Sequence, residues 1–294
     1  MTLAIRVQNL SKNYGKIKVL NNISFDVTEG DVLGLAGPNG SGKTTLLKIL
    51  NHCITDYAGS LQIQDHDLNR ANVGRITGYM PEMIDMFSDL NALDMMKYVG
   101  RLRGLNKRLA DRRAGELLEW LGMKERAHDR IQYFSAGMKK KVLLAQSLIN
   151  DPQILFLDEP TSNLDPSARR QLIMKIEGLK NQGKTMIISS HALPELDTIC
   201  TSYCILSSGS VVSLEKVPQG FSHELHVSNP ALVLAEMEQK GLNGALGEGN
   251  VVLVNWNETL NHLMGELILN NKLTVLELRK ATAGIEKKYF EQVA

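Results

Sequence analysis

The sequence has few cysteines and almost no excess of charge of either sign. Its 294 residues include three cysteines, Cys53, Cys200 and Cys204, which is too few for a disulfide framework, so we expect a reduced, intracellular chain. Cys200 and Cys204 are four residues apart and could share a helix face. We interpret them as buried thiols, because metal sites usually show more ligands at closer spacing. The 33 basic residues nearly balance the 32 acidic ones, so the net charge gives no general reason to expect nucleic-acid binding.

Long apolar runs are also missing. None approaches the roughly 20 residues that are needed to span a bilayer. The N-terminus has no basic region followed by a long apolar stretch, so no signal peptide is expected. Any role at a membrane would therefore need a partner protein. The length does allow a sizeable core, with one large domain and one small one.

Apolar residues are distributed as in an α/β protein. Residues 3–10 and 19–27 alternate apolar and polar side chains, which predicts half-buried strands of an antiparallel sheet. Continuous apolar runs suited to buried parallel strands occur at 31–37, 154–158 and 185–190. Residues 43–52 and 89–121 have apolar residues at helical spacing. The alternation of strands and helices predicts a mostly parallel core sheet covered by helices, with an antiparallel N-terminal part.

The composition changes after about residue 216. Strand patterns then occur at 223–229, 250–256 and 273–279. Helical patterns occur at 230–241, 258–271 and 285–294. We predict a main domain at 1–215, with a helical subdomain at about 83–150, and a small C-terminal α/β domain at 216–294.

The segment 37–44 fits the phosphate-loop pattern G-x-x-x-x-G-K-[ST] and lies between an apolar strand and a helix. Its glycines let the backbone curl so that N–H groups point at phosphate oxygens, and the start of the helix adds the positive end of its dipole. We expect Lys43 to reach the β- and γ-phosphates and to take part in catalysis, and the Thr44 hydroxyl to bind Mg²⁺. The predicted nucleotide-binding residues of this segment are Asn39, Gly40, Ser41, Gly42, Lys43, Thr44 and Thr45.

Two carboxylates follow the apolar run 154–157, at the end of a strand where open α/β sheets bind ligands. Asp158 is predicted to hold Mg²⁺, directly or through water. Glu159 is predicted to orient and polarise the water that attacks the γ-phosphate. The alternative is a solvated acidic strand end, which the nearby phosphate loop disfavours.

With these motifs, residues 1 to about 215 resemble the nucleotide-binding subunits of ABC transporters. The segment Phe134-Ser135-Ala136-Gly137-Met138 matches the family signature, whose common form is LSGGQ. In the family this turn faces the γ-phosphate held by another subunit, so the resemblance implies that Ser135 and the Gly137 N–H contact ATP across a dimer. The lysines at 139–141 point three ways around a helix, so we interpret most of them as a solvated face, with Lys139 the best placed to sense nucleotide.

Three further matches support the resemblance. Tyr14 precedes Gly15 as the family's adenine-stacking aromatic does, with an ordinary surface or core tyrosine as the alternative. His191 follows the apolar run 185–190, where the family has a histidine that contacts the γ-phosphate. The segment Ser162-Asn163-Leu164-Asp165 would lie at the dimer seam, and Asp165 also fits a helix N-cap followed by Pro166.

Glu82 is a departure, because many family members have glutamine at this position. It could still ligate Mg²⁺, but it adds a negative charge. The Pro81-Glu82 pair, the signature ending in Gly137-Met138 and the C-terminal tail resemble ABC-2-type exporter ATPases. The whole chain also resembles the ATPases that serve copper-site maturation of nitrous oxide reductase. Export is therefore favoured, while the substrate is not readable from the chain.

One phosphate loop and one signature imply that a complete site needs two chains. The resemblance implies a head-to-tail homodimer around two ATP molecules, with Mg²⁺, working on an integral membrane permease subunit at the cytoplasmic face of the membrane, and with no nucleic acid. Met80, Met83, Met86 and Phe87 would form either a surface for that partner or part of the core. The alternative function is a soluble ABC-type ATPase that acts on ribosomes or DNA. The tail could in addition serve as a dimerisation or regulatory module.

Overall fold

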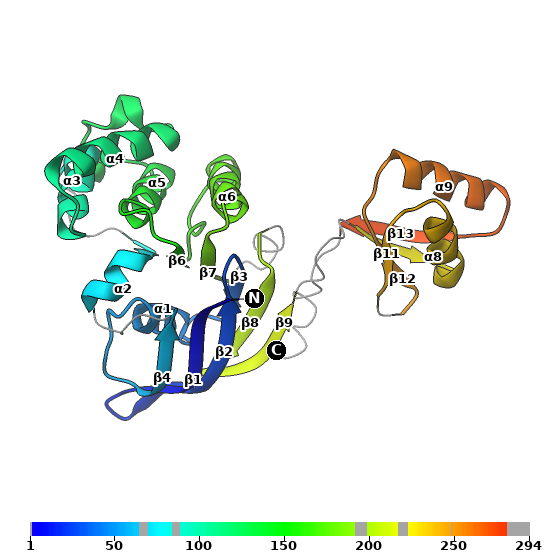
Figure 1. Cartoon of the computed structure of the whole chain (residues 1–294), viewed down its shortest axis with the longest axis horizontal. Helices are drawn as coiled ribbons and strands as arrows, with labels where there is room; N and C mark the ends of the chain where they lie inside the picture. Colours follow the sequence, from blue (N-terminus) through cyan, green and yellow to red (C-terminus); the bar gives the residue numbers. More distant parts are fainter. Residues whose placement is uncertain are drawn as a thin grey trace. The chain divides into compact units, whose positions relative to one another are not determined.

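The computed structural model describes residues 2–64, 70–83, 89–191, 199–216, 223–247 and 249–280. These residues form two compact units, one within Met1–Lys216 and the other within Val217–Glu291 (Figure 1). The division concerns compactness alone, so the roles assigned to 1–215 and 216–294 stay predictions.

A six-stranded sheet forms the centre of the first unit. In spatial order its strands are β5 (Thr77–Met80), β6 (Ile154–Asp158), β7 (Thr185–Ser190), β3 (Val32–Ala36), β8 (Ser202–Ser207) and β9 (Ser210–Lys216). All neighbouring pairs are parallel except β8 and β9. Strands β3, β6 and β7 are buried along their whole length, as their continuous apolar runs predict. Because these three strands are parallel neighbours, their C-terminal ends lie side by side at one edge of the sheet.

A second, antiparallel sheet lies beside the first. Its order is β2 (Ile17–Thr28), β1 (Leu3–Tyr14) and β4 (Ala58–Ile63), and the two strands predicted from alternation are confirmed. Helix α1 (Lys43–Leu50) packs against both sheets (Figure 1). It contributes Leu46, Leu47, Ile49 and Leu50 to one core with side chains of β1, β3 and β6. This packing fixes the start of α1 next to the end of β3.

Helices fill the rest of the first unit. They are α2 (Arg70–Ile76), α3 (Ala92–Leu102), α4 (Lys107–Trp120), α5 (Ala136–Ser147) and α6 (Pro166–Asn181), with short 3₁₀ turns η1 (Lys124–Arg126) and η2 (Ile131–Tyr133). The helical pattern predicted over 89–121 is two helices, because the chain turns at Gly104 with a φ of 88°. Helix α6 begins as predicted, with Pro166 in its first turn and the Asp165 carboxylate accepting from the Ser167 and Ala168 N–H groups.

The second unit is a smaller α/β fold. Its elements are β10 (His223–Val227), α8 (Pro230–Gln239), β11 (Gly244–Leu246), β12 (Val251–Val254), α9 (Glu258–Leu269) and β13 (Val275–Lys280). The strands form an antiparallel sheet in the order β11-β12-β10-β13, and both helices share a core with it. The predicted strands and the first two helices are confirmed. The short strand β11 was not expected, and the helix predicted at 285–294 lies outside the described residues.

The two cysteines near residue 200 were expected to be buried and to share a helix face. Cys200 and Cys204 are both buried thiols, but the shared helix face is wrong, because Cys204 lies on β8. In the part of the chain that the structure describes, no cluster of three histidine, cysteine or carboxylate side chains could hold a metal. Among the same residues, no helix combines the length and apolar character needed to cross a bilayer.

Candidate functional site

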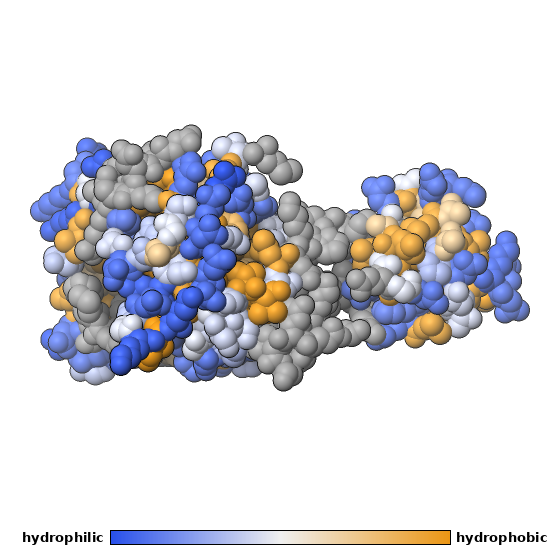
Figure 2. Space-filling model, turned by 90° about the horizontal axis from the view of Figure 1, so that it is seen from below, coloured by the Kyte–Doolittle hydropathy of each residue, from blue (hydrophilic) through white to orange (hydrophobic). Residues whose placement is uncertain are grey.

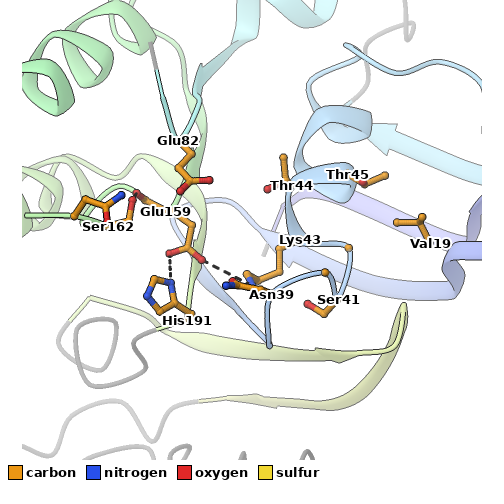
Figure 3. Close-up of a pocket in the computed structure, with 13 residues that line it drawn as sticks. Val19, Asn39, Ser41, Lys43, Thr44, Thr45, Glu82, Glu159, Ser162 and His191 are labelled. Carbon is orange, nitrogen blue, oxygen red and sulfur yellow. Dashed lines mark hydrogen bonds and ion pairs between the residues drawn. The ribbon is translucent and has the colours of Figure 1, made fainter. Parts of the chain in front are cut away.

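A cleft of about 690 Å³ lies at the C-terminal ends of β3, β6 and β7 (Figure 3). The loop after β3 forms one wall of the cleft. Glu159, which follows β6, and His191, which follows β7, also line it. The cleft is lined by Val19, Asn39, Gly40, Ser41, Gly42, Lys43, Thr44, Thr45, Glu82, Glu159, Ser162, Asn163 and His191. Three segments that are far apart in sequence thus meet because their strands are neighbours.

The loop between β3 and α1 has the curled backbone that the glycine pattern predicts. Gly40 and Gly42 have φ angles of 80° and 104°, which side-chain-bearing residues rarely adopt. Gly42 is also the N-cap of α1. A Cβ there would lie 2.6 Å from Leu20 Cδ2 and 3.0 Å from the Val19 carbonyl oxygen, so glycine is required sterically as well.

Lys43 is held inside the loop. Its Nζ donates to the carbonyl oxygens of Gly37 at 2.7 Å and Pro38 at 3.1 Å, and only 7% of the residue is exposed. Nζ also lies 3.8 Å from Glu159 Oε1. Burial lowers the pKa of Lys43, and nearby carboxylates, first of all Glu159, oppose that shift. The site therefore holds a cation whose backbone partners could be exchanged for phosphate oxygens.

Ser41 provides an independent sign of a missing polar ligand. The residue is 3% exposed, and its hydroxyl oxygen has no hydrogen-bond partner among the described residues. Buried polar groups are nearly always satisfied in folded proteins. Because the hydroxyl belongs to the phosphate-loop segment that lines the cleft, a phosphate oxygen there would satisfy it.

Asp158 is fixed by three hydroxyl groups. Its Oδ1 accepts from Ser189 at 2.7 Å and from Thr44 at 3.1 Å, and its Oδ2 accepts from Tyr79 at 3.4 Å. Burial, reinforced by the charge of Asp158, raises the pKa of Tyr79, so its hydroxyl stays a donor. Asp158 itself is 1% exposed. The Thr44 hydroxyl and this carboxylate form an oxygen pair of the kind that Mg²⁺ prefers, and the residues present therefore fit the ion.

Glu159 adopts a backbone conformation that is uncommon for a residue with a side chain. Its φ is 45°, in the left-handed region. The carboxylate lies between two cationic or hydrogen-bonding groups: Oε2 accepts from His191 Nδ1 at 2.8 Å, and Oε1 faces Lys43 (Figure 3). The Glu159 side chain is 9% exposed, whereas that of His191 is 56% exposed. His191 therefore presents most of its ring to the open side of the cleft.

Of the four remaining predicted site residues, Glu82 lines the cleft and three do not. Glu82 lines the cleft two residues after β5, on the side opposite His191 (Figure 3). Tyr14 is 46% exposed at the end of β1, with Lys12 Nζ 5.0 Å from the centre of its ring, and does not line the cleft. Ser135 and Gly137 do not line it either: Ser135 caps α5 by accepting from the Met138 N–H at 3.3 Å.

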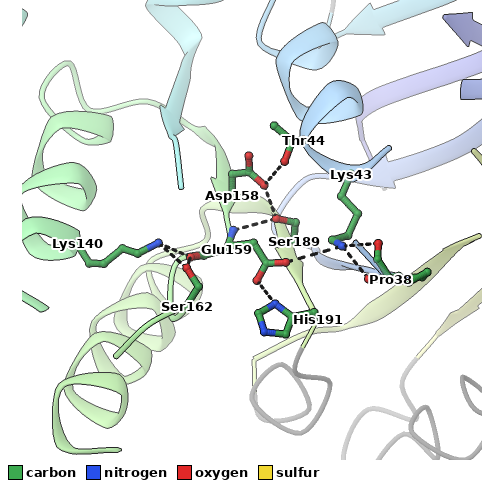
Figure 4. A network of polar contacts seen from close by, with 10 residues as sticks. Pro38, Lys43, Thr44, Lys140, Asp158, Glu159, Ser162, Ser189 and His191 are labelled. Atoms are coloured by element: carbon green, nitrogen blue, oxygen red, sulfur yellow. Dashed lines mark hydrogen bonds and ion pairs between the residues drawn. The ribbon is translucent and has the colours of Figure 1, made fainter. Parts of the chain in front are cut away.

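Sequence reasoning missed two side chains that support the site. Ser189 bridges the two carboxylate residues, donating to Asp158 and accepting from the Glu159 N–H at 2.9 Å (Figure 4). The sequence pattern favours a solvated face for most of the lysines at 139–141 and does not single out Lys140, which is 5% exposed and reaches the loop after β6. A polar residue inside the run 185–190 was a usable signal for Ser189, whereas nothing in the run of lysines separates Lys140 from its neighbours.

The two described methionines near Glu82 differ in exposure. Met80 is fully buried on β5 and belongs to the core, while Met83 is 62% exposed. Met86 and Phe87 lie outside the described residues.

Comparisons with known proteins agree with this arrangement. The model of the family described as ABC transporter matches residues 20–162. The linearmycin resistance ATP-binding protein LnrL of Bacillus subtilis is 31% identical over 212 residues, which are 71% of this chain and 68% of that protein. The Nod factor export ATP-binding protein I of Cupriavidus metallidurans is 33% identical over 227 residues, covering 76% of this chain and 73% of that protein.

A solved structure has the same fold. It is the dimeric, post-hydrolysis state of the ATP-binding cassette MJ0796 bound to ADP and Pi, which matches with a TM-score of 0.66 at 24% identity over 74% of this chain and all of that chain.

Proposed function

The chain belongs to the ABC transporter family as an ATP-binding subunit that hydrolyses ATP, and we propose that it works as a head-to-tail pair with a second copy of itself. The observation that carries the proposed chemistry is the Glu159 carboxylate, held between Lys43 and His191 at the mouth of the phosphate loop. This arrangement supports a site in which a carboxylate, a cation and an imidazole face the terminal phosphate together.

We assign the binding of the phosphates to the loop before α1. Its backbone N–H groups and the start of α1 surround the β-phosphate, and the unpartnered Ser41 hydroxyl donates to a phosphate oxygen. Lys43 exchanges its two loop carbonyls for the β- and γ-phosphates. Burial lowers the pKa of Lys43, but the negative charge of a bound phosphate would favour the protonated ammonium and so oppose that shift.

Mg²⁺ would be held by the Thr44 hydroxyl, with Asp158 and Glu82 as the carboxylates in reach of the same side of the cleft. When bound, the ion would neutralise charge on the phosphate oxygens and keep them in a fixed orientation. Glu82 adds a negative charge to this group of ligands where a glutamine would be neutral.

Hydrolysis is assigned to Glu159 and His191. Glu159 Oε1 accepts a proton from the attacking water, and His191 Nδ1, bonded to Oε2, keeps the carboxylate turned into the cleft. The exposed remainder of the His191 ring faces the γ-phosphate and can donate to it when both ring nitrogens carry a proton. Lys43 offsets the negative charge that develops on that phosphate.

The second copy supplies what one cleft lacks. Ser135 and Gly137 lie at the N-terminus of α5 but outside the cleft of their own chain. A donor hydroxyl and free N–H groups at a helix start suit a terminal phosphate, so we assign them to ATP bound by the partner copy. The dimer of the related cassette MJ0796 supports this pairing. Tyr14 is assigned to the adenine ring, which would compete with Lys12 for its face.

The proposed membrane partner is a permease subunit that exports its substrate. Two relatives are named for Nod factor export and for linearmycin resistance, which supports export. We propose that the permease contacts the surface near Glu82, where Met83 is exposed, and that the chain lies on the cytoplasmic face of the membrane. A substrate that contains copper, and a regulatory role for the C-terminal unit, stay predictions.

The test of this proposal is Glu159→Gln, which keeps the size of the side chain and one of its two acceptor oxygens but removes its ability to act as a base. ATP binding should persist, turnover should fall by about 100-fold or more, and an ATP-dependent dimer should accumulate and be visible by light scattering. A variant that hydrolyses ATP near the wild-type rate would remove Glu159 from the mechanism.

A further inference from the structure

Lys140 is the middle lysine of the run 139–141 in α5, and it is the buried one. It is 5% exposed, whereas Lys139 and Lys141 remain partly exposed. Its Nζ donates to the Glu159 carbonyl oxygen and, at 3.0 Å, to the Ser162 hydroxyl (Figure 4). The Ser162 hydroxyl also donates to that carbonyl, at 2.9 Å. The side chain therefore crosses from α5 to the loop that carries the general base.

The contact matters because of the backbone at Glu159. A left-handed φ is unfavourable for a residue with a Cβ, and Glu159 has a φ of 45°. Its peptide groups are held on both sides: the N–H by Ser189, and the carbonyl by Lys140 and Ser162. Rotation of the backbone toward an ordinary φ would break these hydrogen bonds. The same rotation would turn the carboxylate away from Lys43 and His191.

Burial of the Lys140 ammonium is unfavourable because the charge loses its hydration. Desolvation lowers the pKa of Lys140, and the carboxylates of Glu82, Glu159 and Asp158 only partly oppose it. A neutral apolar side chain of the same length would avoid the loss of hydration that burial of the ammonium requires. The cation is therefore better explained by what it holds than by the stability of the fold.

We propose that Lys140 is a positioning residue for ATP hydrolysis, which fixes the left-handed backbone of Glu159, and thus its carboxylate, from helix α5. This inference rests on the proposed role of Glu159. It adds to that role a link between α5, which Ser135 caps and whose first turn contains Gly137, and the general base of the same chain.

The test compares three variants of the full chain by steady-state ATP hydrolysis and by equilibrium binding of ATP. Lys140→Met removes the ammonium and keeps the length, Lys140→Arg keeps a cationic donor, and Lys141→Met is the matched control. Lys141 belongs to the same run but bonds Gln171 Oε1 at 3.1 Å, away from the cleft. We expect Lys140→Met to lower kcat by about 10-fold or more with KM and ATP affinity within about threefold, Lys140→Arg to recover part of kcat, and Lys141→Met to match wild type.

Other outcomes overturn the inference in distinguishable ways. A normal kcat in Lys140→Met refutes it. Equal losses of kcat, ATP binding and thermal stability would reduce Lys140 to a packing residue. If Lys140→Met does not fold, Lys140→Gln is measured in its place, with the same expected split between kcat and KM. Glu159→Gln is run in parallel: if it keeps full activity, the proposed function fails, whereas if it is inactive and Lys140→Met is normal, only the role of Lys140 fails.

Discussion

The Ser189 hydroxyl donates a hydrogen bond of 2.7 Å to Asp158 Oδ1, from the neighbouring strand of the sheet. The oxygen of the Ser189 hydroxyl also accepts from the Glu159 N–H, at 2.9 Å. One buried hydroxyl thus orients the proposed metal ligand and the proposed general base together. A hydroxyl can serve both contacts because it donates through its O–H and accepts through its lone pairs.

Ser189→Ala should loosen the proposed metal ligand. The change leaves the Glu159 N–H without this partner, at a cost of about 1–3 kcal/mol, and frees Asp158 to rotate away from Thr44. We expect the Mg²⁺ concentration for half-maximal activity to rise by about 10-fold. Ser147→Ala is the control, because that buried hydroxyl bonds the Leu144 carbonyl inside α5. Identical Mg²⁺ titrations for Ser189→Ala and wild type would contradict the assignment.

Lys43→Ala should weaken ATP binding. The variant loses a charge-assisted donor to the phosphates, which corresponds to about 1.5–3 kcal/mol, or roughly 10- to 100-fold in Kd. Isothermal titration calorimetry with ATP measures the change directly. Lys48→Ala is a matched control, since this lysine lies on the same helix but is exposed. An unaltered Kd in Lys43→Ala would show that the cation serves the fold and not the nucleotide.

Mixing two inactive variants should restore some ATP hydrolysis. In homodimers, Lys43→Ala and Ser135→Arg each damage both composite sites. In a head-to-tail heterodimer both lesions fall on one site, and the other site is intact. We expect each variant alone to be nearly inactive and the mixture to recover measurable turnover, while Ser135→Arg alone retains ATP binding. A Ser135→Arg chain with the normal rate would refute a role for the signature across the dimer.

Hydrolysis should decline in alkaline solution through Lys140. Burial lowers the pKa of Lys140 to about 8, and the carboxylates of Glu82, Glu159 and Asp158 face it. Below that pH the ammonium makes a charge-assisted bond to the Glu159 carbonyl, and above it the bond is that of a neutral amine and is weaker. The wild-type kcat should therefore fall as the pH rises from about 7.5 to 9. Lys140→Met, whose side chain does not titrate, should lack that limb of the profile. A limb that persists in Lys140→Met would belong to another group, of which Lys43 is the first to examine.

Much of the site is readable from the sequence because its main parts are short and continuous. The phosphate loop at 37–44, the carboxylates after 154–157 and His191 each follow an apolar run that forms a buried strand. Parallel strands bring their C-terminal ends to one edge, so these predicted residues meet in the cleft. The N-cap at Asp165 was predictable for the same reason, since capping is decided within one turn of helix.

The sequence by itself determined eight of the described strands (β1, β2, β3, β6, β7, β10, β12 and β13), most of the helices, the phosphate loop and most of the residues that line the cleft. The strands β4, β5, β8, β9 and β11 and the place of Val19 in the cleft became apparent only in the structure. Only the tertiary structure decided that Lys140 is buried, that Ser189 bridges Asp158 and Glu159, and that Met80 is core while Met83 is exposed. Three consecutive lysines look alike in sequence, and which of them faces the interior depends on how α5 is rotated against the loop after β6. That rotation is set by packing between segments about 20 residues apart and by hydrogen bonds across them, and local patterns of hydropathy contain no information on it.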